Sequence, residues 1–66
     1  MMQTITHADG TQYKVERRGT GRLYDRYFVY SVHGYYPVYA MTPDEAVTKA
    51  RAAYTAYLIR TGTIPA

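Results

Sequence analysis

The chain has no cysteine and no tryptophan, and its 66 residues include no long apolar run. Without cysteine, neither a disulfide nor a thiolate metal site can stabilise the fold. No segment approaches the roughly 20 apolar residues of a membrane-spanning helix. The N-terminal sequence MMQTITHADG lacks the basic start and apolar core of a signal peptide. We therefore expect a cytoplasmic protein in a reducing setting, without membrane association.

Residues suited to catalysis are also scarce. Ser31 is the only serine, and the two histidines stand apart without metal-ligand spacing. The five acidic residues are spread over different expected elements. A nuclease could gather Glu16, Asp25 and Asp44 around a metal ion, but their spacing does not indicate one. We expect a protein that is not an enzyme and has no catalytic residue, metal or cofactor.

Tyrosine and positive charge are the distinctive features of the composition. Tyrosine supplies 9 of the 66 residues, and the formal net charge is +3. Tyrosine combines a large apolar ring with a polar tip, so it tolerates a half-exposed surface. A small, basic, Tyr-rich domain suits nucleic acid or an acidic protein surface. The plainer alternative is that tyrosine is present as a good strand former and that the charge is modest.

The most informative stretch is 27–59, which we expect to form a strand, a tight turn, a strand and a helix. The turn is predicted at His33 and Gly34, which places Val32 opposite Tyr35 in an antiparallel pair. Proline in the second strand predicts that this strand lies at an edge. The same register pairs Tyr30 with Pro37, Phe28 with Tyr39 and Arg26 with Met41.

The two faces of this hairpin differ in character. One is rich in aromatic rings, whereas the other carries more small apolar residues, and we expect the helix to cover the second. The alternative is an Ala-rich helix on the larger aromatic face. Either way aromatic surface remains uncovered, which indicates a partner or a dimer. The aromatic face comprises Tyr24, Arg26, Phe28, Tyr30, Val32, Tyr35 and Tyr39, and the Val/Ala face comprises Tyr27, Val29, Ser31, Tyr36, Val38 and Ala40.

The helix has clear start and stop signals. Thr42 is predicted as the N-cap, Pro43 suits the first helical position, and Glu45 completes a capping box. Asp44 and Glu45 favour the positive end of the helix dipole, so we assign them to capping. Gly62 is the predicted stop. The apolar stripe at helical spacing comprises Ala46, Val47, Ala50, Ala53, Tyr54, Tyr57 and Leu58.

An earlier hairpin is predicted in the first 18 residues. Asp9 and Gly10 form a strong two-residue turn signal, because a type I′ turn needs positive φ at both positions. If Ala8 pairs with Thr11, then Thr6 lies opposite Tyr13, and this pair belongs to the more apolar face of the hairpin. The same register places Thr4 opposite Val15.

The two hairpins are joined by RRGTGR, residues 17–22. Its arginines could donate to phosphate oxygens, with glycine allowing close approach of the backbone. No P-loop pattern is present, and a solvated connection between hairpins is the alternative. The predicted phosphate donors are Arg17, Arg18 and Arg22.

These elements predict an α+β fold in which a small antiparallel sheet of two hairpins packs on one C-terminal amphipathic helix, in the order ββββα. A chain of this length forms one domain and buries only about 60% of the surface of its unfolded state. We assign 1–66 to this single domain, with the first hairpin at 1–18, the basic Gly loop at 19–22, the second hairpin at 23–41, the helix at 42–60 and a tail at 61–66.

The residues YFVYSVHGYYPVYAMTPDEAVTKARAAYTAYL, 27–58, carry two family resemblances. Their strand, Gly-bearing turn, strand and T-x-x-EA helix resemble the HicB-like antitoxins. The chain lacks the Pro-Asp-Leu-Pro-Gly-like segment that those domains carry at the turn. The same stretch is similar to the arm-binding domain of phage integrases, which lays a three-stranded sheet in DNA. Both resemblances imply strand–strand–helix architecture more than a function. We separately expect an origin in a phage or other mobile element.

We expect a small binding module that recognises nucleic acid or a nucleoprotein machine through a basic, Tyr-rich sheet face. One alternative is a protein inhibitor of a host defence complex, similar to the anti-CRISPR proteins. Another is a HicB-like antitoxin, and either could act as a homodimer. The predicted binding residues are Lys14, Arg17, Arg18, Arg22, Tyr24, Arg26, Tyr30, Tyr35 and Tyr39.

Overall fold

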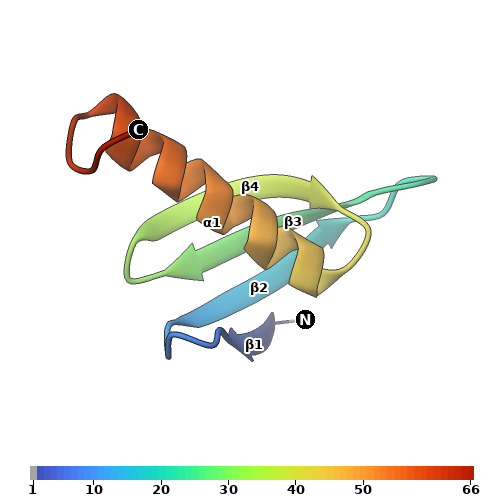
Figure 1. Cartoon of the computed structure of the whole chain (residues 1–66). Helices are drawn as coiled ribbons and strands as arrows, with labels where there is room; N and C mark the ends of the chain where they lie inside the picture. The colour runs from blue at the N-terminus through green and yellow to red at the C-terminus, as the bar shows by residue number, and fades with distance from the viewer. Residues whose placement is uncertain (1) are drawn as a thin grey trace.

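The computed structural model describes residues 2–66, which form a four-stranded antiparallel sheet packed against one helix (Figure 1). The strands lie in chain order, β1-β2-β3-β4, and the helix crosses one face of the sheet. The predicted α+β class and the ββββα order are therefore confirmed. The elements are β1 (Met2–Thr6), β2 (Gln12–Gly19), β3 (Asp25–Ser31), β4 (Gly34–Ala40) and α1 (Pro43–Arg60).

The core lies between α1 and the face of the sheet that carries valine and alanine, as predicted. Three small residues of the first helical turns, Ala46, Val47 and Ala50, are buried there. Alanine lets the helix backbone approach the sheet closely, so the large rings of the core come from the strands. The sheet contributes Tyr13, Val15, Tyr27, Val29 and Ala40, with Ile5, Tyr36 and Val38 packed at the margin.

The register of the second hairpin differs from the prediction by two residues. Ser31 pairs with Gly34 and Tyr30 with Tyr35, so the turn consists of Val32 and His33. The Ser31 hydroxyl accepts a hydrogen bond from the His33 N–H at 3.0 Å, and this closes the turn one residue early. Gly34 follows with φ of +123°. Side chains alternate between faces, so the two-residue shift leaves the predicted faces of β3 and β4 intact.

The register of the first hairpin is wrong by one residue. Ile5 lies opposite Tyr13, where Thr6 was predicted. The turn is longer than a two-residue loop, because the His7 N–H donates to the Thr11 carbonyl and the Gly10 N–H to the His7 carbonyl, both at 2.9 Å. A one-residue shift exchanges the two faces of β1. Ile5 is consequently directed to the core, and the threonines are exposed.

Both helix ends follow the predicted chemistry. The Thr42 hydroxyl accepts the Glu45 N–H at 3.1 Å, and the Glu45 carboxylate accepts the Met41 N–H at 2.9 Å. The first bond is that of the predicted capping box, whereas the carboxylate reaches the N–H of the residue before the N-cap rather than that of Thr42 itself. At the other end Thr61 is the C-cap, and Gly62 adopts the positive φ of +78° that ends the helix. The helix between them is not apolar enough to cross a membrane, and residues 2–66 contain no other helix.

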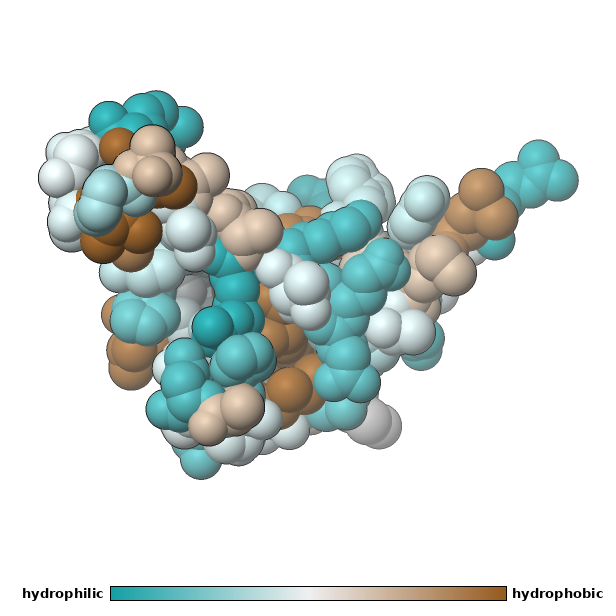
Figure 2. Space-filling model, viewed as in Figure 1, coloured by the Kyte–Doolittle hydropathy of each residue, from teal (hydrophilic) through white to brown (hydrophobic). Residues whose placement is uncertain are grey.

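The second half of the predicted helix stripe is half-buried or exposed rather than part of the core. Ala53 is exposed and Tyr57 retains 47% of its surface, because α1 continues past the edge of the sheet (Figure 1). Tyr54 is half-buried and stacks on His33 of the β3–β4 turn, with 4.4 Å between ring centroids. Hydrophobic atoms gather at this end of the molecule (Figure 2).

Candidate functional site

The sheet surface opposite α1 has no element of residues 2–66 packed on it. Strand residues alternate between faces, so this surface is formed by the side chains that point away from the core. Across β2, β3 and β4 the register aligns them in rows. We call this surface the outer face, and it comprises Lys14, Glu16, Arg18, Arg26, Phe28, Tyr30, Tyr35, Pro37 and Tyr39.

Aromatic rings occupy the centre and one edge of the outer face. Tyr35 meets Phe28 edge to face, with ring centroids 5.2 Å apart and an interplanar angle of 86°. It also contacts Tyr30 at 5.2 Å and 35°. Tyr35 and Tyr39 on the edge strand β4 stay 49% and 64% exposed. The inner rings therefore support one another, while the edge rings remain available to a ligand.

Two arginines are held against the same phenyl ring. The guanidinium carbon of Arg18 lies 4.6 Å from the Phe28 ring centroid, and that of Arg26 lies 5.2 Å from it. The negative face of an aromatic ring attracts such cations. The Arg18 guanidinium also donates to the Glu16 carboxylate at 3.1 Å. Two planar cationic groups are thus positioned in the middle of the outer face before any ligand arrives.

A bulge in β2 places Arg18 on this face. The register with β3 shifts between Arg17, which lies opposite Tyr27, and Gly19, which lies opposite Arg26. Arg18 is the additional residue between them, and bulges commonly redirect a side chain in this way. The bulge was not predicted from the sequence. Its only signal was the glycine that follows two arginines near the end of the strand.

The outer face carries a surplus of positive charge, with three cationic side chains and one carboxylate. Two of these cations, Lys14 and Arg26, make no ion pair with any of residues 2–66. Elsewhere the charges largely compensate each other. The helix-side pairs are Arg17–Asp25 at 3.6 Å, Lys49–Glu45 at 3.8 Å and Arg51–Asp9 at 3.2 Å.

The structure brings most of the predicted binding residues together but separates three of them. Arg17 lies on the helix side, where it pairs with an aspartate and lines a hollow of about 330 Å³ beside the buried Tyr27. Tyr24 was predicted on the aromatic face, but it lies beneath Lys49 of α1, with the ammonium 5.1 Å from its ring centroid. Arg22 lies in the β2–β3 connection. The six that share the outer face are Lys14, Arg18, Arg26, Tyr30, Tyr35 and Tyr39.

The β2–β3 connection, residues 20–24, forms an arm that projects from the sheet (Figures 1 and 2). Leu23 in this arm is 77% exposed. Gly21 is required there, because a Cβ at that position would lie 2.3 Å from the Tyr24 carbonyl oxygen. The first half of RRGTGR is strand rather than loop, since β2 continues to Gly19. The three arginines of that motif consequently occupy three separate places.

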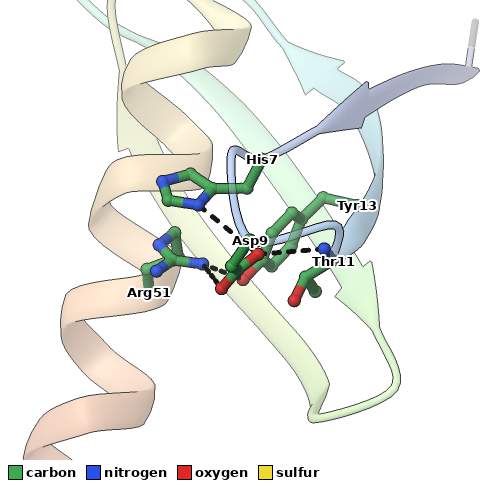
Figure 3. Close-up of polar contacts among 5 residues, drawn as sticks. All are labelled: His7, Asp9, Thr11, Tyr13 and Arg51. Atoms are coloured by element: carbon green, nitrogen blue, oxygen red, sulfur yellow. Dashed lines mark hydrogen bonds and ion pairs between the residues drawn. The ribbon is translucent and has the colours of Figure 1, made fainter.

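A polar cluster on the helix side joins the first hairpin to α1 (Figure 3). The Arg51 guanidinium donates to the Asp9 carboxylate at 3.2 Å and to the Tyr13 hydroxyl at 2.9 Å. Asp9 also accepts the Thr11 N–H at 2.9 Å. The His7 Nδ1 lies 3.5 Å from Asp9 Oδ1 but lacks hydrogen-bond geometry. Sequence spacing could not reveal this cluster, because Asp9 and Arg51 are 42 residues apart.

The charge of Asp9 is stabilised in this cluster. Its pKa is lowered mainly by the hydrogen bond from the Thr11 backbone, with Arg51 adding to the effect. The hydrogen bond to Tyr13 is the largest cause that raises the pKa of Arg51, and the contact with Asp9 adds to it. Both shifts favour the charged forms, so the cluster is an ion pair at neutral pH. Its position indicates that it ties the hairpin loop to the helix.

Acidic pH is expected to remove the stabilisation that Asp9 supplies. A carboxyl with a depressed pKa in the folded state stabilises the fold above its ordinary pKa of 3.8 and loses that contribution as the pH falls further. The difference in urea midpoint between the wild type and Asp9→Asn should therefore be largest at neutral pH and shrink below pH 3.8. Arg51→Met, measured over the same pH range, shows how much of this stabilisation comes from the ion pair between Asp9 and α1. A difference independent of pH would contradict this role.

No family model, curated protein or solved structure matches this chain. The resemblances to HicB-like antitoxins and integrase arm-binding domains therefore stay predictions. Among residues 2–66, no three histidine, aspartate or glutamate side chains gather as a metal site would require. The outer face is the surface on which charge, aromatic rings and exposure coincide.

Proposed function

We propose that the protein is a non-enzymatic binding module that recognises nucleic acid through its outer face. The observation that carries the proposal is the pair of guanidinium groups of Arg18 and Arg26 on the Phe28 ring, beside exposed tyrosines. Guanidinium groups match phosphate geometry, and tyrosine rings stack on bases or pack on sugars. The other face of the sheet is covered by α1 and cannot offer such a surface.

Each class of side chain on the outer face has a distinct role in this proposal. Arg18, Arg26 and Lys14 neutralise phosphates, which supplies affinity without regard to sequence. Tyr35 and Tyr39 add contacts to bases or sugars from the edge strand. The hydrogen bond between Glu16 and Arg18 fixes one guanidinium, so less side-chain freedom is lost on binding.

Fluorescence anisotropy of labelled oligonucleotides, measured from about 50 mM to about 200 mM salt, tests the proposal. Three phosphate contacts predict that log K falls with log salt with a slope of about −2 on a single strand. A slope near zero, or no binding at about 50 mM salt, would reject nucleic acid as the partner.

A protein partner, such as a host nucleoprotein complex that the chain inhibits, is the second candidate. The exposed side chains Leu23 and Tyr39 favour it, because large exposed apolar groups are typical of docking surfaces. Its affinity would depend on the tyrosines and change little with salt.

A homodimer closed through the outer face would appear as a doubled mass in sedimentation equilibrium, and Tyr39→Ala would return it to the monomer.

A further inference from the structure

We infer that the outer face selects single-stranded over duplex nucleic acid, with bases on its tyrosines and phosphates on its paired arginines. The inference rests on the proposed function and narrows it to one class of ligand. It follows from the arrangement of rings and cations, from the spacing of the two exposed tyrosines and from the width of the sheet.

The exposed tyrosine rings can stack on a base only if that base is not already stacked between its neighbours. In a duplex each base is stacked between neighbours and shows only its edge in the grooves. A single strand can splay its bases and present their flat faces to aromatic side chains. Tyr35 and Tyr39 offer such rings at the edge of the sheet, and Tyr35 is held in place by Phe28 and Tyr30.

The spacing of the tyrosines also fits an extended strand. Tyr35 and Tyr39 are four residues apart on β4, which places them about 13 Å from each other at the usual rise of a strand. Bases that stay stacked follow one another at only about 3.4 Å. Between the two tyrosines, in the register of the sheet, lies the row of Phe28, against which Arg18 and Arg26 are held. Along β4 the outer face therefore presents Tyr35, Pro37 and Tyr39, and the two guanidinium groups lie beside this row, over Phe28 of β3.

The four-stranded sheet is broader than the elements that usually enter the major groove of a duplex. Four strands span about 14 Å between the axes of β1 and β4. The major groove is about 12 Å wide and admits a helix or a two-stranded ribbon. The one helix of residues 2–66 is packed on the opposite face. On a duplex the outer face would meet the phosphate backbone alone, and its tyrosines would have no bases to stack on.

Competition between ligands of one sequence tests the inference directly. A labelled single strand is bound to the protein and displaced by unlabelled single-stranded DNA, single-stranded RNA or duplex DNA at equal nucleotide concentration. We expect both single strands to compete at least tenfold better than the duplex. The DNA and RNA arms identify which polynucleotide is preferred. A duplex that competes equally well or better would overturn the inference while leaving the proposed function standing, and absence of binding to every ligand would overturn both.

Tyrosine variants provide the second arm of the test. Tyr35→Leu and Tyr39→Leu should each weaken single-strand binding about fivefold to a hundredfold, the range for loss of one stacked base, and leave duplex binding unchanged. Tyr39→Phe keeps the ring and should bind as the wild type does. Tyr57→Leu is the matched control, because Tyr57 is comparably exposed but lies on α1. Equal losses in Tyr57→Leu and Tyr39→Leu, or none in either strand variant, would overturn the inference.

Discussion

Tyr27→Ala is expected to lower the free energy of unfolding by about 3–5 kcal/mol, the range for removal of a large buried ring. Tyr27 is buried in the same core cluster as Val15 and Val29, and only 3% of its surface is exposed. Its burial and the nearby Asp25 carboxylate raise the pKa of its phenol, so the ring stays neutral there. A domain of this length has a total stability of about 3–10 kcal/mol, so this one change can unfold much of the population.

Urea denaturation followed by circular dichroism measures this loss, and two variants define its origin. Tyr27→Phe keeps the ring and should stay folded, which separates packing from the hydroxyl. Tyr39→Ala removes the same side chain from the outer face, where it is 64% exposed. Its effect should stay within about 0.5 kcal/mol, as for other surface changes. Similar losses for Tyr27→Ala and Tyr39→Ala would mean that the two faces of the sheet are wrongly assigned.

The fold class and the buried face of the second hairpin could be predicted because both depend on patterns with a fixed period. Side chains alternate between the two faces along β3 and β4, so a register shift of two residues leaves each residue on the same face. The register there was wrong by two residues, and Tyr27 and Val29 still reached the core. The helix was equally predictable, because Thr42 and Glu45 carry local start signals.

The first hairpin shows where such prediction fails. Asp9 and Gly10 indicated a two-residue turn, but Asp9 instead accepts the Thr11 N–H and pairs with Arg51 on α1. The bond to Thr11 is local, whereas the pair with Arg51 joins the turn to a residue 42 positions away. The longer turn goes with the one-residue shift that places Ile5 on the core side. Sequence patterns contain no information about such a distant partner.

The candidate site was predicted in composition but not in arrangement. Arginine and tyrosine were expected on one surface, and six of the nine predicted residues do share the outer face. The paired placement of Arg18 and Arg26 on Phe28 depends on a bulge, which shifts the register after Arg17. The sequence predicted a flexible loop there, either as a phosphate clamp or as a solvated connection. The structure shows a preorganised pair on the sheet.

Removal of the Arg18 and Arg26 side chains is expected to have the second large effect, a loss of nucleic-acid binding. The double variant Arg18→Ala/Arg26→Ala should weaken nucleic-acid binding about a hundredfold at low salt, since each charge-assisted hydrogen bond contributes about 1.5 kcal/mol or more. Its plot of log K against log salt on a single strand should be shallower by about 1.4, the contribution of two phosphate contacts. Anisotropy titrations at several salt concentrations provide both quantities.

A second double variant distinguishes a defined phosphate site from general attraction to a basic protein. Arg17→Ala/Arg60→Ala removes the same charge from the helix side of the sheet and from the end of α1. If phosphates bind at the outer face, this control keeps most of the affinity and nearly the full salt slope. If the two variants weaken binding equally, net charge alone drives association, and the pair on Phe28 has no special role. The comparison also tests the original prediction for Arg17, because a loss larger than that of the outer-face variant would place the site on the helix side.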